Sequence, residues 1–366
     1  MSSESLAYLS NNLVYAAMVV FTLAMVAFAA SFARGRGRSD AAASVSVAAR
    51  TADAGAPAVS AAAGGGSSVS VATVERAEPV ASSGTASSSG RSSSGTASSS
   101  GAGRGDDDVL EPGRRAGNIA MSLMWLGELL LLAGVLTRGL SAGRVPLGNM
   151  YEFSITSALG ITAAFLLVSL RRDVRWLGLF VVVPVLLTLG MAVTVLYTDS
   201  AQLVPALKST WLVIHVSAAI ICAGGFTVGA AVTLLFLAVD RVDRRVAAGR
   251  SPGALGGIAA RVPSADRLDT LAYRVNAFVF PLWTFTVVAG AIWAENAWGR
   301  YWGWDPKETW AFITWVVYAG YLHARVTAGW KGRKAAYVAL VGFAAFLFNY
   351  FGVNIFLTGL HSYAGL

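Results

Sequence analysis

The residues with the most distinctive chemistry form the segment Trp298–Trp310, which reads Trp-Gly-Arg-Tyr-Trp-Gly-Trp-Asp-Pro-Lys-Glu-Thr-Trp. The segment is too polar to cross a membrane, although apolar segments flank it on both sides. Six of the chain's 11 tryptophans lie within the 23 residues from Trp293 to Trp315. Tryptophan and tyrosine also gather at bilayer surfaces, but this density favours a platform that stacks on and encloses a planar ligand.

Five aromatic side chains of this segment are candidates to hold such a ligand. On a helical turn, residues at i, i+3 and i+4 share one face, and the first three of the five have that spacing. The candidates are Trp298, Tyr301, Trp302, Trp304 and Trp310. Arg300 is either a partner for an acidic group of the ligand or an arginine of the membrane interface.

The acidic residues of the segment have a structural interpretation. Asp305 is a favoured helix N-cap, Pro306 suits the first helical position, and Glu308 completes a capping box. These residues are therefore predicted to begin the next helix, and no catalytic role is assigned to them. Their value would be to hold the tryptophans rigidly over the ligand.

The chain has three histidines, and two of them are expected beside the aromatic segment. His215 lies about one turn inside an apolar stretch, and His361 follows the last apolar stretch. Taken alone, each fits a hydrogen-bonded structural histidine. Together, two imidazoles on one side of a membrane, next to an aromatic loop, match the axial ligation of a haem iron.

The third histidine, His323, is expected near the opposite, cytoplasmic side of the membrane. An ionisable side chain within a span is costly and is a functional candidate by default, although Arg325 nearby also fits an ordinary interfacial position. If His323 binds haem iron, the second axial ligand has to come from another subunit, because this chain offers no further histidine.

Composition predicts that these residues are positioned by a membrane protein. Hydrophobic residues make up 55% of the chain, charged residues only 13%, and the mean hydropathy is +0.59, which excludes a soluble domain. A span needs about 20 apolar residues. Eight runs predict an all-α integral membrane bundle of about eight transmembrane helices: 12–33, 116–138, 151–170, 176–197, 211–239, 276–295, 308–328 and 335–357.

Basic residues predict the orientation of this bundle. They gather in 34–115, 171–175, 240–274 and 325–334, which are alternate connections. The net charge of +8 therefore reflects the positive-inside rule and not nucleic-acid binding. Both termini and the aromatic segment are predicted to face outward, on the side of the membrane opposite the basic connections. The first run lacks a basic n-region and a convincing cleavage site, so it is expected to be retained.

The predicted organisation has three parts. Residues 1–33 are expected to form an N-terminal transmembrane helix, 34–115 a cytoplasmic linker, and 116–366 a seven-helix domain. The linker is rich in Ala, Ser and Gly and repeats Ser-Ser-Gly-Thr-Ala-Ser-Ser-Ser-Gly, a composition that predicts disorder. The single cysteine, Cys222, can form neither an internal disulfide nor a CxxC pair, so any thiol chemistry belongs to a partner, such as a thiol-reducing membrane protein.

The aromatic segment resembles the WWD signature of haem-handling proteins in cytochrome c maturation. Four further segments resemble the CcsA/ResC type of these proteins, often called CcsB in actinobacteria. These segments are Leu203–His215, Gly290–Glu295, Tyr321–His323 and Gly352–Tyr363. The resemblance extends from about residue 117 to the end of the chain, so the first helix and the linker lie outside it.

The resemblance implies functional assignments for all three histidines. His215 and His361 match the external axial ligands of haem at the WWD site, and His323 matches a ligand nearer the cytoplasm. The family works with a ResB/Ccs1-type membrane subunit that supplies the missing histidine. Haem b would pass from the inner side to the aromatic site and be attached to the two thiols of a Cys-x-x-Cys-His motif in apocytochrome c, as in a cytochrome c synthase of the haem lyase type.

Two other functions stay open on the residues alone. A solute transporter would need polar residues along a path at mid-membrane, and the helices offer few, among them Glu128, for which the sequence gives no role. A haem-binding electron carrier would need histidine pairs inside the bundle, and only His323 qualifies.

Overall fold

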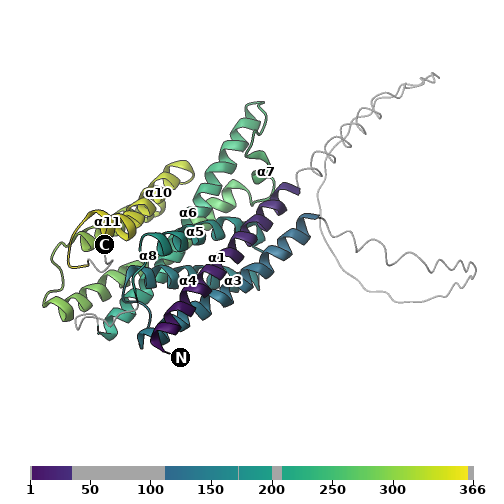
Figure 1. Ribbon diagram of the computed structural model, residues 1–366. Coiled ribbons are helices and arrows are strands. Elements are labelled where there is room, and N and C mark those ends of the chain that lie inside the picture. The colour runs from purple at the N-terminus through teal and green to yellow at the C-terminus, as the bar shows by residue number, and fades with distance from the viewer. Residues whose placement is uncertain (1, 35–111, 172, 200–207, 362–366) are drawn as a thin grey trace, which may run out of the picture. The chain divides into compact units, whose positions relative to one another are not determined.

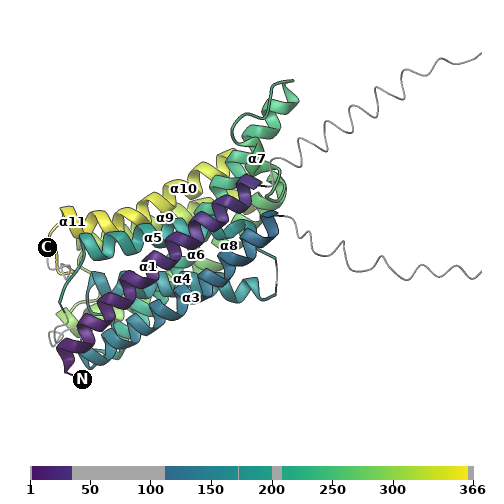
Figure 2. The same cartoon turned by 45° about the vertical axis from the view of Figure 1, so that its right-hand side comes forward.

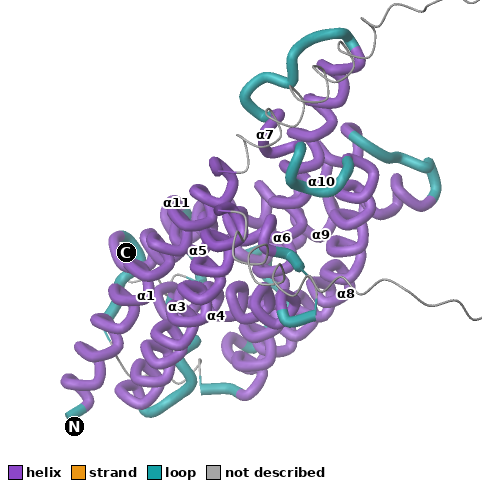
Figure 3. Tube along the Cα trace, turned by 90° about the vertical axis from the view of Figure 1, so that its right-hand side faces the viewer, coloured by secondary structure: helices purple, strands orange, loops and turns teal. Residues whose placement is uncertain are grey.

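In the computed structural model, the residues that the structure describes are 2–34, 112–171, 173–199 and 208–361. These residues form helices and no strand (Figure 3). The chain clusters into two units, and the second, Gly37–Leu110, lies outside the described residues, as does almost all of the predicted linker. The helices are α1 (Ser3–Arg34), α3 (Pro112–Ala142), α4 (Met150–Ser169), α5 (Arg175–Thr194), α6 (Thr210–Ala247), α7 (Gly256–Ala259), α8 (Ala265–Trp298), α9 (Pro306–Val326), α10 (Arg333–Leu347), the π-helix η2 (Phe348–Gly352) and α11 (Val353–Phe356).

The prediction of an all-α integral membrane protein is confirmed. Among the described residues, seven helices are long and apolar enough to span a membrane, and they coincide with seven of the eight predicted runs. The remaining run, 308–328, corresponds to α9, a helix of 21 residues. It is not among the seven helices that are apolar enough to span, and Lys307, Glu308, His323 and Arg325 lie within it, so its status as a span stays a prediction.

The N-terminal helix packs along the whole length of α3 (Figures 1 and 2). A Cβ atom at Gly127 of α3 would lie 2.5 Å from the Phe21 ring, so this glycine makes room for a large buried side chain of α1. Nearby, the Ser10 hydroxyl donates to the Gly134 carbonyl over 2.7 Å. The first helix is therefore built into the bundle, although the linker separates it from α3 in the sequence.

The interior has two main apolar clusters. One joins α1, α3, α4 and α5 with the C-terminal half of α6 and the start of α8, and the other joins α6, α8, α9 and α10. In the second cluster, Phe226 stacks on Tyr318 with ring centroids 4.2 Å apart and contacts Trp283 and Phe346. Because α4 packs against α6, the two clusters form one continuous bundle. This bundle fixes the positions of the helix ends, among them the starts of α4, α6 and α9 and the end of α8.

Candidate functional site

A cavity lies at the end of the bundle where α4, α6 and α9 begin, α8 ends and η2 follows α10. Its wall is mostly apolar, and both His215 and His361 line it. The sequence therefore predicted correctly that these two side chains would meet, although 146 residues separate them. Aromatic side chains on the wall include Phe153, Trp283, Trp293, Tyr301, Trp302 and Tyr350.

His215 is held by α8. Its Nδ1 atom lies 2.9 Å from the Thr286 carbonyl oxygen, and its ring stacks on Trp293 at an interplanar angle of 11°. A Cβ atom at Gly290 would lie 2.7 Å from the imidazole Cε1, so only glycine lets the ring lie this close to α8. The carbonyl at Nδ1 fixes the orientation of the ring, and it leaves Nε2 as the ring nitrogen that could bind a metal.

His361 is held by the residue that caps α9. Its Nδ1 atom lies 2.9 Å from Asp305 Oδ1, and its ring makes edge contacts with Trp298 and Trp293 at centroid distances of 4.8 and 5.7 Å. The Leu360 N–H also donates to the Asp305 carboxylate over 2.6 Å. One carboxylate thus orients both the imidazole and the backbone that carries it, an arrangement typical of histidines that bind metal.

The predicted capping box of α9 is present. Asp305 accepts from the Lys307 N–H over 3.1 Å, and the Glu308 carboxylate accepts from the N–H groups of Gly303 and Asp305 over 2.8 and 3.1 Å. Burial alone would raise the pKa of Asp305, but the hydrogen bond and charge of His361 and the two backbone N–H groups hold this pKa below its ordinary value. The cap therefore also keeps a negative charge beside His361.

The aromatic candidates occupy different positions. Tyr301 and Trp302 line the cavity. Trp298 does not line it but packs edge-on against His361, which does. Trp304 is 64% exposed and packs edge-on against Trp302 and Phe312. Trp310 does not line the cavity and packs on Phe348 with ring centroids 4.2 Å apart. The segment is thus a folded layer in which two rings face the cavity and the others support it.

The backbone of this layer is strained at one residue. Trp304 has φ 58°, a left-handed conformation that costs roughly 1–2 kcal/mol for a residue other than glycine. The strain is offset by the hydrogen bonds of the capping box on either side of Trp304. Such conformations persist where the surrounding structure determines them, often at binding sites.

The two cations of the segment also differ. Arg300 is paired with Glu308, with 3.6 Å between Arg300 Nη1 and Glu308 Oε1, and its guanidinium packs over Gly303. It does not line the cavity, whereas Lys307 does. Of the two, Lys307 is thus the cation that a ligand in the cavity would meet.

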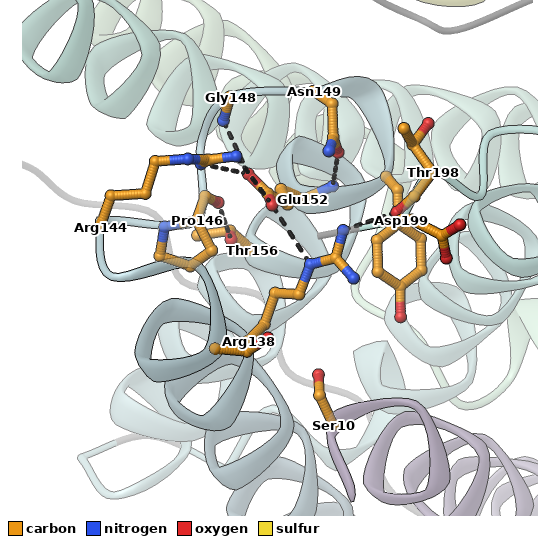
Figure 4. Close-up of polar contacts among 12 residues, drawn as sticks. Ser10, Arg138, Arg144, Pro146, Gly148, Asn149, Glu152, Thr156, Thr198 and Asp199 are labelled. Atoms are coloured by element: carbon orange, nitrogen blue, oxygen red, sulfur yellow. Dashed lines mark hydrogen bonds and ion pairs between the residues drawn. The ribbon is translucent and has the colours of Figure 1, made fainter. Parts of the chain in front are cut away.

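The wall contributed by α4 is anchored by a buried carboxylate (Figure 4). Glu152 accepts from Arg138 over 3.2 Å, from Arg144 over 2.7 Å and from the Gly148 N–H over 2.8 Å. Arg138 and Glu152 are both 0% exposed. Because Gly148 and Asn149 line the cavity, this network fixes the loop that closes one side of the site.

His323 lies outside this cavity. It is in the last turn of α9, and its side chain is exposed in the described part of the chain. Next to it, Arg325 pairs with Asp269 of α8 over 2.8 Å. The structure thus separates His323 from the other two histidines, as the sequence predicted.

Comparisons with known proteins place the chain in a family. A family model described as cytochrome C assembly protein matches residues 147–361. The chain belongs to this family. It is 38% identical over 299 residues to the cytochrome c biogenesis protein CcsA of Microcystis aeruginosa, an alignment that covers 69% of this chain and 88% of the relative. The CcsA proteins of Synechocystis and Guillardia theta are 37% and 36% identical over 291 and 242 residues, covering 67% and 63% of this chain and 87% and 80% of the relatives.

The resemblance to CcsA is thus confirmed, and the protein is a multi-pass membrane protein of cytochrome c biogenesis. The part matched by the cytochrome C assembly family contains the whole cavity and ends at His361, whereas α1 and α3 precede it. In this family member, Glu128 of α3 is buried and accepts a hydrogen bond from the Thr162 hydroxyl of α4. It is a packing contact between helices and does not line the cavity.

Sequence reasoning missed three features of the site. Trp293 was counted with the aromatic cluster, yet it is the ring that touches both cavity histidines. Asp305 was interpreted as a cap alone, and Lys307 was given no role. The density of tryptophans pointed to Trp293, but no local pattern relates Asp305 to His361, because they are 56 residues apart.

Proposed function

We propose that this protein binds haem b in the cavity, with His215 and His361 as the two axial ligands of the iron, and presents it for attachment to apocytochrome c. The observation that carries the proposal is that both imidazoles reach one aromatic-walled cavity, each oriented through Nδ1 by a separate acceptor. Bis-imidazole ligation through Nε2 fits that arrangement.

The proposed contribution of the protein to attachment is positioning. The aromatic wall would enclose the macrocycle, the two imidazoles would occupy both faces of the iron, and the open Trp304 side of the layer would admit the apocytochrome. Each thioether would form when a cysteine S–H of the Cys-x-x-Cys-His motif adds across a haem vinyl group. The chain supplies no thiol, because Cys222 is buried among α6 and α8.

The proposed route begins at His323, on the other end of α9. Its exposed side chain supports a second haem site shared with a ResB/Ccs1-type subunit, because the other two histidines of the chain line the cavity. Haem would move from that shared site to the cavity, which we place on the outer face of a bacterial cytoplasmic membrane from the pattern of basic loops.

Visible spectra of the protein purified with its partner subunit test the cavity assignment. His215→Ala and His361→Ala should each lose haem from the cavity and fail in cytochrome c maturation, and added imidazole should restore both by filling the vacated axial position. His323→Ala serves as the matched control, because it should leave the spectrum of haem loaded into the cavity unchanged. Wild-type spectra and full maturation in both cavity variants would overturn the proposal.

A further inference from the structure

Apart from two tyrosines, the cavity has four ionisable side chains on its wall, and their pairing is unequal. They are His215, Lys307, Glu308 and His361. The two histidines are oriented by their acceptors, and Glu308 is bonded to two backbone N–H groups and paired with Arg300. In the part of the chain that the structure describes, the ammonium group of Lys307 has no hydrogen bond and no ion pair.

The carboxylate of Asp305 attracts this ammonium electrostatically but forms no ion pair with it. Asp305, two residues earlier, bonds to Lys307 only through the backbone N–H. Its two carboxylate oxygens are also engaged by His361 and by the Leu360 N–H. Lys307 is thus a half-buried cation on a mostly apolar wall, a placement that costs free energy unless an anion pairs with it.

We propose that Lys307 is the ion-pair partner of a carboxylate on the cavity's ligand, which for haem is a propionate. The inference rests on the proposed function, and it names the cation that selects the acidic edge of the ligand. Arg300 is unsuited to that role because Glu308 already pairs with it. With the propionate held at the start of α9, the haem has one orientation about its iron axis.

The test varies the ligand and the residue together. The purified complex with its partner is titrated with haem and with haem dimethyl ester, whose propionates are uncharged, and binding is followed by the visible spectrum. All proteins compared, including the reference called wild type in this titration, carry His323→Ala, so that only the cavity is loaded. Wild type should bind haem about tenfold more tightly than the ester, the effect expected of one charge-assisted pair. Lys307→Gln should lose that preference by weakening haem binding alone, and Lys307→Arg should retain most of it.

Lys331→Gln is the matched control, because Lys331 is an exposed lysine between α9 and α10, and it should keep the wild-type preference. A Lys307→Gln variant that still prefers haem over the ester as wild type does would overturn the inference, as would a wild type that binds both equally. Failure of the proposed function is distinguishable, because wild type would then give no bis-imidazole spectrum with either ligand.

Discussion

The two ends of α9 carry histidines in opposite settings. At its start, the cap residue Asp305 holds His361 within a cavity that also contains His215. At its end, His323 is exposed beside the Arg325–Asp269 ion pair. One end brings two imidazoles of this chain to one cavity, and the other offers a single imidazole. The difference indicates that the cavity is preorganised, whereas the haem site that we propose at His323 would need a ligand from a partner.

The largest effect should separate the two ends directly. His361→Ala removes a proposed axial ligand and should lower the haem affinity of the cavity by more than about 100-fold. Removing an iron ligand should cost more affinity than removing the group that orients that ligand, which costs about 10- to 100-fold. His323→Ala should leave haem loaded from solution bound in the cavity and should impair only maturation that depends on haem from the inner side. Equal haem loss in both variants would break the distinction.

A smaller effect should follow from the carboxylate that orients His361. Asp305→Asn keeps an acceptor for the Lys307 N–H but loses the negative charge, so it should weaken haem binding about 10- to 100-fold. It should also raise the midpoint potential of the bound haem, because the imidazole becomes a weaker donor. Asp269→Asn is the control, because Asp269 of α8 pairs with Arg325 at the other end of α9, and it should change neither haem affinity nor midpoint potential.

The close approach at His215 predicts a more modest loss. In Gly290→Ala, the new Cβ lies 2.7 Å from the imidazole, so the ring must shift at a cost of about 1–3 kcal/mol. Haem titration should show weaker binding. Gly190→Ala in α5 shares the gain in helix propensity but meets nothing within 4 Å, and its haem affinity should equal that of wild type.

The smallest effect is expected at Arg300. Arg300→Gln breaks the ion pair with a carboxylate that keeps two backbone N–H donors, so haem affinity should fall by less than about threefold, in the range of a partly exposed pair. A loss as large as that of Lys307→Gln, measured in the same titration, would show that Arg300 also meets the ligand.

Local patterns predicted the helices, the cap and the meeting of the two histidines. Hydropathy over a run of residues determines where a span lies, and the alternation of basic loops brought His215 and His361 to one end. The same patterns could not show that the last run divides into α10, η2 and α11, because a π-helix depends on packing as well as on the local sequence.

Contacts between distant residues were beyond sequence reasoning. The hydrogen-bond partner of His361 is Asp305, the N-cap of α9. Which of Arg300 and Lys307 can meet a ligand depends on the pairing of Glu308 with Arg300 and on which cation lines the cavity. Both facts follow from how α9 packs against the chain end, which no local propensity encodes. Trp293 is similar, since its contacts with both histidines exist only once α6 and α8 are paired.

The most direct test of the central claim is the axial-ligand signature of ferric haem in the cavity. Electron paramagnetic resonance is recorded on the His323→Ala complex, in which only the cavity is loaded and which serves as the parent. It is then recorded on two double variants that combine His323→Ala with His215→Met or with His361→Met. The parent should show bis-imidazole low-spin haem, and each methionine variant should change to a signal of imidazole–thioether ligation. A bis-imidazole signal that survives both substitutions would contradict the assignment of His215 and His361 as the paired ligands.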